Sequence, residues 1–161
     1  MKIVKLCSVL ILALVISNCS NNKDKKENMA VEVEEASVEK SLFERLGGTE
    51  GISLIVDDIV QAHMENEEIN YVFLPLKEDP EHLESFKKHV REFLAAGTGG
   101  GTAYTGKDLP TAHKGLETTA NEFLSAVDDI LQVLNAHQID EETKKDMLFI
   151  LYSLKGQVIG K

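Results

Sequence analysis

The sequence contains only two cysteines, and both lie within the first 19 residues, at Cys7 and Cys19. A folded part further along the chain therefore has no thiol with which to form a disulfide framework or a cysteine-based metal site. Any metal bound there must be held by histidine, carboxylate or thioether groups.

Basic residues are also few, because 17 Lys and Arg stand against 27 Asp and Glu, for a formal net charge of −10. Phosphate contacts need clustered Lys and Arg, so this composition argues against nucleic-acid binding. If Lys2 and Lys5 are removed with an export signal, 15 basic residues remain against 27 acidic ones, and the formal charge becomes −12. An acidic, solvated surface is ordinary for an exported protein.

Several chemical signatures are missing as well. The glycine cluster at 97–101 follows a predicted helix and lacks the Gly-Lys-Ser/Thr ending of a phosphate-binding loop. The acidic pairs 57–58 and 128–129 are expected on solvent-facing surfaces, so no pair of carboxylates suggests acid–base catalysis. No stretch alternates between apolar and polar residues with a period of two, which argues against β-strands.

The N-terminal apolar run, from Val9 to Ile16, is too short to span a bilayer, which needs about 20 apolar residues. Together with Lys2 and Lys5 it predicts an export signal over residues 1–19. The sequence Ser17-Asn18-Cys19 resembles a bacterial lipoprotein cleavage box, in which Cys19 becomes the acylated first residue. Asn18 differs from the usual small residue at its position. Plain secretion with cleavage elsewhere, or an uncleaved anchor, therefore stays open.

Residues 20–40 are polar and charged, without aromatics, and predict a flexible tether. The remaining residues, 41–161, are enough for one folded domain. We expect an exported protein that a lipid anchor holds at a bacterial membrane, facing the periplasm or the cell exterior.

Apolar residues recur at helical spacing throughout 41–161, so we predict an all-α fold without internal repeats. A short helix over 42–46 should precede one that starts at Glu50 with Thr49 as its N-cap. A short turn over 69–73 and a helix opened by Asp79-Pro80 follow. Three further helices are expected. The first is short and carries His113, and the second begins at Thr118 or Thr119. The third begins at Asp140 and turns apolar residues inward as far as Val158.

His113 stands in the short, mostly apolar stretch LPTAHKGL (109–116). An isolated histidine of this kind is ordinarily a core or surface residue, but a neutral imidazole can also bind a metal. The local sequence alone does not choose between these two interpretations.

Two segments resemble group 1 truncated haemoglobins. SLFERLGGTEGISLIVDDI (41–59) resembles the family's opening, in which a very short first helix meets a Gly-Gly turn, and FLAAGTGGGTAYTGKDLPTAHKGL (93–116) resembles its segment from the distal helix to the proximal histidine. The resemblance extends over 41–158. It implies a two-over-two helical globin that holds haem b.

The resemblance implies a role for two residues beside the haem. His113 matches the proximal ligand, whose Nε2 binds iron while an acceptor for its Nδ1–H fixes the ring. Phe73, at the end of NYVF, matches the aromatic residue that packs against the haem face; otherwise it is simply a core residue.

The distal side departs from the family pattern. Val60 stands where the family has a ligand-stabilising tyrosine, Val90 where a glutamine is common, and Phe86 at another position that can be polar. A hydrogen bond to bound O2 is worth about 1.5–3 kcal/mol. Its loss would weaken O2 retention by roughly one to two orders of magnitude, so a tight oxygen carrier is not the first expectation.

His89 lies between Phe86 and Val90, at a position that supplies a sixth iron ligand in some members of the family. It would give a bis-histidyl iron together with His113. Alternatively, His89 points to solvent or to a haem propionate. His63, His82 and His137 have no comparable setting and are predicted to be surface residues.

Three functions remain open. The first is reversible binding of O2, NO or CO. The second is a redox haem protein, such as an electron carrier or an enzyme resembling an NO dioxygenase, which bis-histidyl ligation would favour. The third is a haem-free globin domain that binds a partner, and the intact His113 argues against it. The sequence identifies no reductase partner.

Overall fold

A computed structural model describes residues 39–161 of the chain. The predicted signal segment, the predicted lipid attachment site Cys19 and residues 20–38 of the predicted tether lie outside the described residues. Among the helices of the described part, none combines the length and the apolar character needed to cross a membrane.

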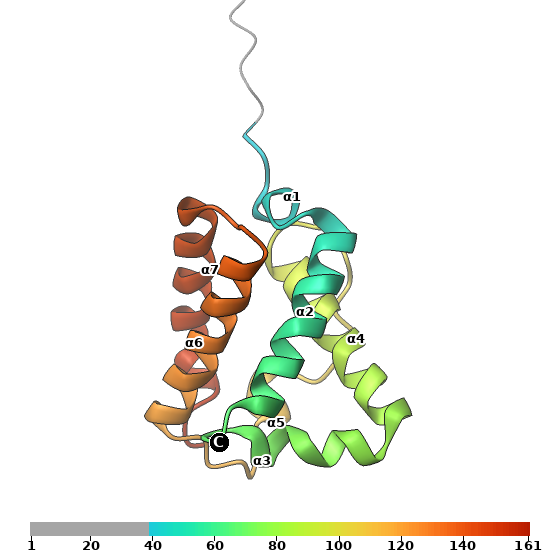
Figure 1. The fold of residues 1–161 in the computed structure, drawn as a ribbon, viewed down its shortest axis with the longest axis vertical. Coiled ribbons are helices and arrows are strands. Elements are labelled where there is room, and N and C mark those ends of the chain that lie inside the picture. The colour runs from blue at the N-terminus through green and yellow to red at the C-terminus, as the bar shows by residue number, and fades with distance from the viewer. Residues whose placement is uncertain (1–38) are drawn as a thin grey trace, which may run out of the picture. The chain divides into compact units, whose positions relative to one another are not determined.

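The prediction of an all-α chain is confirmed for residues 39–161, whose regular elements are all helical (Figure 1). In chain order these are α1 (Leu42–Arg45), α2 (Gly48–Glu65), α3 (Asn70–Phe73), the 3-10 helix η1 (Leu74–Glu78), α4 (Pro80–Gly97), α5 (Leu109–Ala112), α6 (Ala120–Ala136), α7 (Glu141–Leu154) and the 3-10 helix η2 (Lys155–Gln157).

Side-chain caps explain where most of these helices begin. Asp79 and Asp140 accept a hydrogen bond from the backbone of the first turn of α4 and α7, as predicted. Thr119 forms a capping box with Glu122 at the start of α6, which decides between the two predicted threonines. Each cap satisfies backbone N–H groups that have no partner inside the helix.

The predicted N-cap of α2 is wrong. The helix begins at Gly48, and its N-cap is Gly47, whose φ of 87° lies in the left-handed region that glycine adopts without strain. Thr49 therefore lies inside the first turn. The prediction also placed Val158 on the last helix, but α7 ends at Leu154 and the chain continues as η2.

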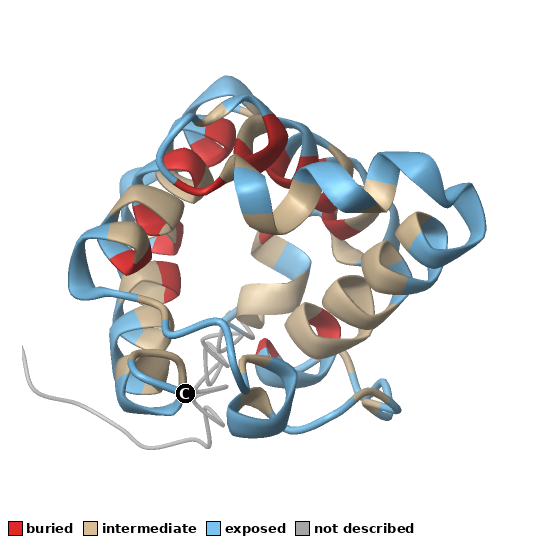
Figure 2. Ribbon diagram, turned by 90° about the horizontal axis from the view of Figure 1, so that it is seen from below, coloured by how far each residue is buried: buried red, intermediate tan, exposed pale blue. Residues whose placement is uncertain are grey.

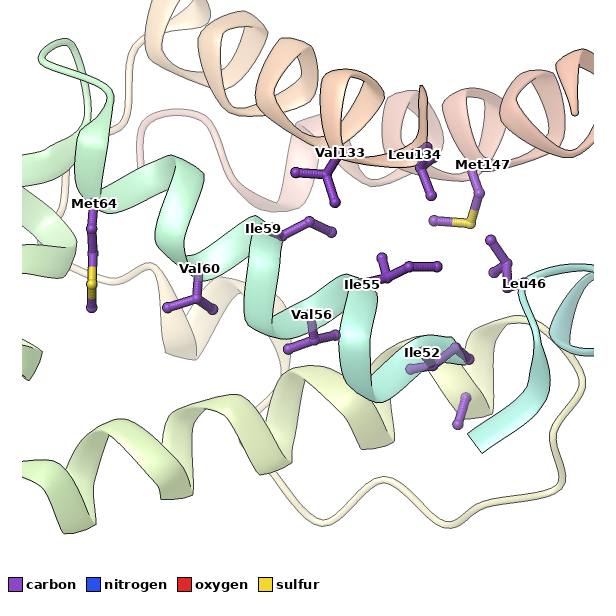
Figure 3. Packing of buried hydrophobic residues seen from close by; sticks show 11 residues of the cluster. Leu46, Ile52, Ile55, Val56, Ile59, Val60, Met64, Val133, Leu134 and Met147 are labelled. Carbon is purple, nitrogen blue, oxygen red and sulfur yellow. The ribbon is translucent and has the colours of Figure 1, made fainter. Parts of the chain in front are cut away.

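Helix α2 is the central element of the fold, because it packs against α4 on one side and against α6 on the other. Helix α7 in turn pairs with α6, which gives two helix pairs, α2 with α4 and α6 with α7 (Figure 1). Figure 3 shows buried side chains of α2 together with those of α6 and α7 that they meet. Ile55 and Ile59 point toward Val133 and Leu134 of α6, whereas Val60 points to the side of α4.

Burial is unevenly distributed among the helices (Figure 2). Helix α2 has buried residues along its whole length, but α4 has a single one, Ala95, although it carries a regular apolar face. The predicted core residues of α4 all remain partly exposed: Leu83, Phe86, Val90, Phe93 and Leu94. The described residues thus leave the apolar face of α4 only half covered.

The contact between α2 and α6 should dominate stability. Leu134 is fully buried there, so Leu134→Ala should lower the free energy of unfolding by about 2–5 kcal/mol through lost burial and an unfilled cavity. The matched control on the same helix is Leu124→Ala, whose side chain is 43% exposed and should cost no more than about 0.5 kcal/mol. Urea unfolding followed by circular dichroism measures both, and equal losses would contradict this view of the core.

Candidate haem site

His113 lies immediately after the short helix α5, as its C-cap. Asp108 caps the start of this helix by accepting a hydrogen bond of 2.8 Å from the N–H of Thr111, and Pro110 lies in the first turn. The backbone N–H of His113 and its ring Nδ1 both lie near the carbonyl oxygen of Leu109, at 3.0 and 2.8 Å. A carbonyl can only accept, so Nδ1 carries a proton, and in the neutral form of the ring the lone pair is on Nε2.

The loop before α5 is attached to α4. Glu92 of α4 accepts hydrogen bonds from the N–H and hydroxyl of Thr105, at 3.2 and 2.7 Å. It also forms an ion pair with Lys88, at 2.7 Å. Lys88 and then Thr105 lower the pKa of Glu92 to about 2. The ring of Tyr104 also packs edge-on against Phe93 of α4. These contacts fix the route by which the chain reaches His113.

The segment after His113 is held by hydrogen bonds to Gly160 and Lys161. The backbone oxygen of Lys161 accepts hydrogen bonds from the N–H groups of Gly115 and Glu117, at 2.9 and 3.1 Å. The N–H of Gly160 returns a bond of 3.0 Å to the carbonyl of Thr118. Residues on both sides of His113 are therefore held by distant parts of the chain.

The four apolar residues predicted for the distal side and the haem face lie in one apolar cluster. Val60 is buried in it, and Phe73, Phe86 and Val90 pack against it while partly exposed. The rings of Phe73 and Phe86 meet edge-on, with their centroids 6.1 Å apart. This cluster is the main core of the described residues, because it also contains Val133 and Leu134 of α6 and Met147 of α7. Val60, Val90 and Phe86 offer no hydrogen-bond donor to it.

His89 lies on α4 beside this cluster. Helical spacing puts it on the same side of the helix as Phe86 and Phe93, at one edge of the apolar face. Its ring is half-buried, and within residues 39–161 no hydrogen bond or ion pair holds it. It thus differs from His63, whose ring is bonded to a carboxylate.

The other edge of α4 is attached to α2 by charge. The carboxylate of Asp57 forms ion pairs with Lys87 at 3.1 Å and with Arg91 at 2.8 Å. Burial alone would raise the pKa of Asp57, but the hydrogen bonds from the two cations outweigh it and lower that pKa. This clamp sets the rotation of α4 about its own axis, and with it the direction of the apolar face.

Comparison with known proteins agrees with this geometry. The model of the family described as bacterial-like globin matches residues 41–159. A group 1 truncated hemoglobin of Mycolicibacterium paratuberculosis is 24% identical over 118 residues, which are 73% of this chain and 83% of the relative. One from Synechocystis is 26% identical over 106 residues, covering 63% and 82% of the two chains.

Solved structures show the same fold. The truncated hemoglobin of Tetrahymena pyriformis superposes with a TM-score of 0.69 at 19% identity, covering 76% of this chain and all of its own. A 2/2 hemoglobin from Synechococcus gives 0.64 at 20% identity, covering 73% and 95%. The chain belongs to the bacterial-like globin family. The predicted resemblance to group 1 truncated haemoglobins and the two-over-two fold are both confirmed.

The described part of this globin contains a buried histidine–carboxylate pair that its sequence did not reveal. His63 and Asp129 were predicted on the surface, but they are only 7% and 8% exposed. The ring Nδ1 of His63 lies 2.8 Å from a carboxylate oxygen of Asp129, across the contact between α2 and α6. The pair is separated by 66 positions, so no local pattern signals it. The predicted surface positions of Asp58, Asp128 and His82 are confirmed, because all three are exposed. The predicted surface position of His137 is wrong, because this residue is half-buried beside Asp58.

Burial lowers the pKa of His63, because the hydrogen bond and charge of Asp129 only partly offset the loss of solvation. The imidazole is thus held neutral in the folded globin, with Nδ1–H donating to Asp129. The neighbouring ring packed on it, that of Phe73, carries no charge.

The lowered pKa should appear as a pH dependence of stability. Folded His63 binds a proton less readily than unfolded His63, so its contribution is complete above the unfolded pKa of 6.5 and is lost as pH falls through the lower folded pKa. The free energy of unfolding of the wild type minus that of His63→Gln should therefore shrink from about pH 7.5 to about pH 5.5. Urea unfolding at several pH values measures the difference, and a constant or growing difference would contradict the prediction.

Proposed function

We propose that this globin binds haem b with His113 as the proximal ligand of the iron, and that it reversibly takes up a diatomic gas such as O2, NO or CO on the opposite side. The orientation of His113 is the observation that carries the proposal. Its Nδ1–H is donated to a backbone carbonyl, which leaves the Nε2 lone pair available for a metal.

The residues present fit this prosthetic group. The candidate iron ligands are single imidazoles, His113 and His89. This suits a haem, where the porphyrin supplies the other ligands of the iron. The half-covered apolar face of α4, with Phe73 beside it, is the kind of surface that a large apolar group would complete.

Haem, when bound, would supply an iron to which a gas coordinates. The chain's own distal residues would exclude water and restrict the space around that position. Val60 is 2% exposed and offers no donor, and neither do Phe86 and Val90. A missing hydrogen bond of about 1.5–3 kcal/mol favours weak retention of O2. Storage of O2 at low concentration is thus the less favoured form of gas binding.

A redox role is the second candidate, and His89 is the observation that favours it. The ring is half-buried at the edge of the apolar face of α4, and no other described residue holds it. As a second axial ligand it would favour electron transfer, or NO detoxification with a reductase as partner. A haem-free interaction domain is disfavoured because His113 is oriented as a ligand.

The location of this chemistry is a proposal from the sequence. A signal segment over residues 1–19 and acylation of Cys19 would hold the globin at a bacterial membrane, facing the periplasm or the cell surface. The acidic composition is compatible with such an exported protein.

Replacement of His113 tests the proposed function. His113→Ala in the full-length protein should abolish stoichiometric haem binding, because it removes the proposed protein ligand of the iron. The matched control is His137→Ala, which removes an imidazole that contacts Asp58 instead and should leave haem binding unchanged. Haem titration followed by absorption spectroscopy measures both. Retention of haem by His113→Ala with an unaltered spectrum would refute the assignment.

His89→Leu tests the redox alternative. If His89 is the second axial ligand, the reduced wild type should show the sharp, split bands of low-spin six-coordinate iron, and the variant the broad band of a five-coordinate one. His82→Leu, an exposed position on the same helix, is the control. Identical spectra of wild type and His89→Leu would show that His89 does not bind the iron.

A further inference from the structure

A buried polar cluster joins α2 to α6 behind Phe73. Its centre is Asp129, which accepts a hydrogen bond from His63 and, through both carboxylate oxygens at 2.9 Å, from the side-chain amide of Asn66. The same amide reaches the hydroxyl of Ser125 at 2.9 Å. A buried carboxylate with these partners has a fixed orientation, because each oxygen has at least one donor.

Stability alone gives a poor reason for such a cluster. Burial of charged and polar groups costs solvation free energy, and apolar residues of similar volume often serve a core equally well. The cluster is thus better understood from what it touches than from the free energy of its own bonds.

One contact of the cluster is with Phe73. The imidazole of His63 lies with its ring centroid 4.9 Å from that of Phe73, at an interplanar angle of 33°. Phe73 in turn meets Phe86 of α4 edge-on. The imidazole therefore supports one side of the phenyl ring, and the distal helix contacts the ring as well.

The local backbone cannot place Phe73 by itself. Helix α3 has only four residues, with Phe73 as its last, and neither α3 nor η1 has a side-chain cap. The start of α3 is held instead by Asn66, whose carbonyl accepts hydrogen bonds from the N–H groups of Ile69 and Asn70 at 3.1 and 2.8 Å. Asn66 is itself bonded to Asp129, so one carboxylate fixes both the beginning of α3 and the ring at its end.

We propose that His63, Asn66 and Asp129 form a positioning cluster for Phe73, and that this cluster sets the placement of the phenyl ring against the haem. The proposal rests on the proposed function for the part that concerns haem. The cluster acts through Phe73, and none of its three members is proposed to touch the iron.

The first test uses the haem-free, full-length chain labelled with ¹³C at phenylalanine. The sequence has six phenylalanines, so Phe73→Leu suffices to assign the Phe73 signals by NMR. His63→Gln keeps a donor for Asp129 but removes the ring, whereas Asp129→Asn keeps the volume and removes the charge. Both should shift the Phe73 signals. The matched control is His137→Gln, which alters the His137–Asp58 contact of 2.7 Å and should leave those signals in place.

The second test measures the rate of haem loss to an excess of an apoglobin acceptor. Phe73→Leu and His63→Gln should each raise the rate by about three- to tenfold, the equivalent of one aromatic contact. The double variant should stay within about twofold of either single variant, because the two changes remove the same contact. Val133→Ala, a destabilising core variant outside the positioning cluster of His63, Asn66 and Asp129, controls for a general loss of stability.

The outcomes separate the two proposals. Unmoved Phe73 signals in Asp129→Asn, which keeps the ring of His63, or rates that multiply in the double variant, would overturn the positioning role. If the wild type takes up no haem, the proposed function fails, and the NMR measurement on the haem-free chain still decides whether the cluster places Phe73.

Discussion

Helix α2 packs against two helices at once, and the rest of the structure depends on this double contact. One side of α2 faces α6 and the other faces α4. Because α2 is a single rigid element, the distance between its neighbours is set by its own diameter and side chains. Helix α4, which carries the proposed distal residues, is therefore positioned from the same core that holds α6 and α7 together. A change inside this core would shift both sides of the candidate site.

The orientation of α4 is determined mainly by polar contacts. Lys87 and Arg91 attach one edge to Asp57 of α2, and Glu92 attaches the other edge to Thr105. The apolar face between these edges is left only half covered by the described residues. Charges at the edges thus direct an apolar surface toward the position proposed for haem. Such an arrangement suits a helix whose main apolar partner is a prosthetic group.

Local signals predicted much of the fold. Asp79, Thr119 and Asp140 cap helices as expected, because a cap depends only on residues within one turn. The prediction of Thr49 as N-cap was wrong because the left-handed conformation of Gly47 allows α2 to start before Thr49. The resemblance to truncated haemoglobins predicted that Val60, Phe73, Phe86 and Val90 lie around the haem. The structure packs all four with the main core, and their place beside a haem stays a prediction.

Long-range partners could not be predicted in the same way. His63 continues the helical spacing of Ile59 and Val60, so the pattern of α2 places it on the buried face. No pattern shows that its partner is Asp129, because only the packing of α2 on α6 brings the two side chains together. The anchoring of Thr105 by Glu92 is equally invisible, because the residues between them form an irregular loop. Sequence periodicity indicates which face of a helix is apolar, but it does not indicate which polar residue at the edge of that face meets a partner.

The hydrogen bonds from Gly115 and Glu117 to the backbone oxygen of Lys161, and from Gly160 to Thr118, give Gly160 and Lys161 a significance that their sequence does not suggest. These two residues are far from His113 in the chain, yet they hold the turn that follows it. A change at either residue would alter the surroundings of the candidate iron ligand without changing any residue next to it in the sequence. Selection that preserves the position of His113 should therefore also act on Gly160 and Lys161.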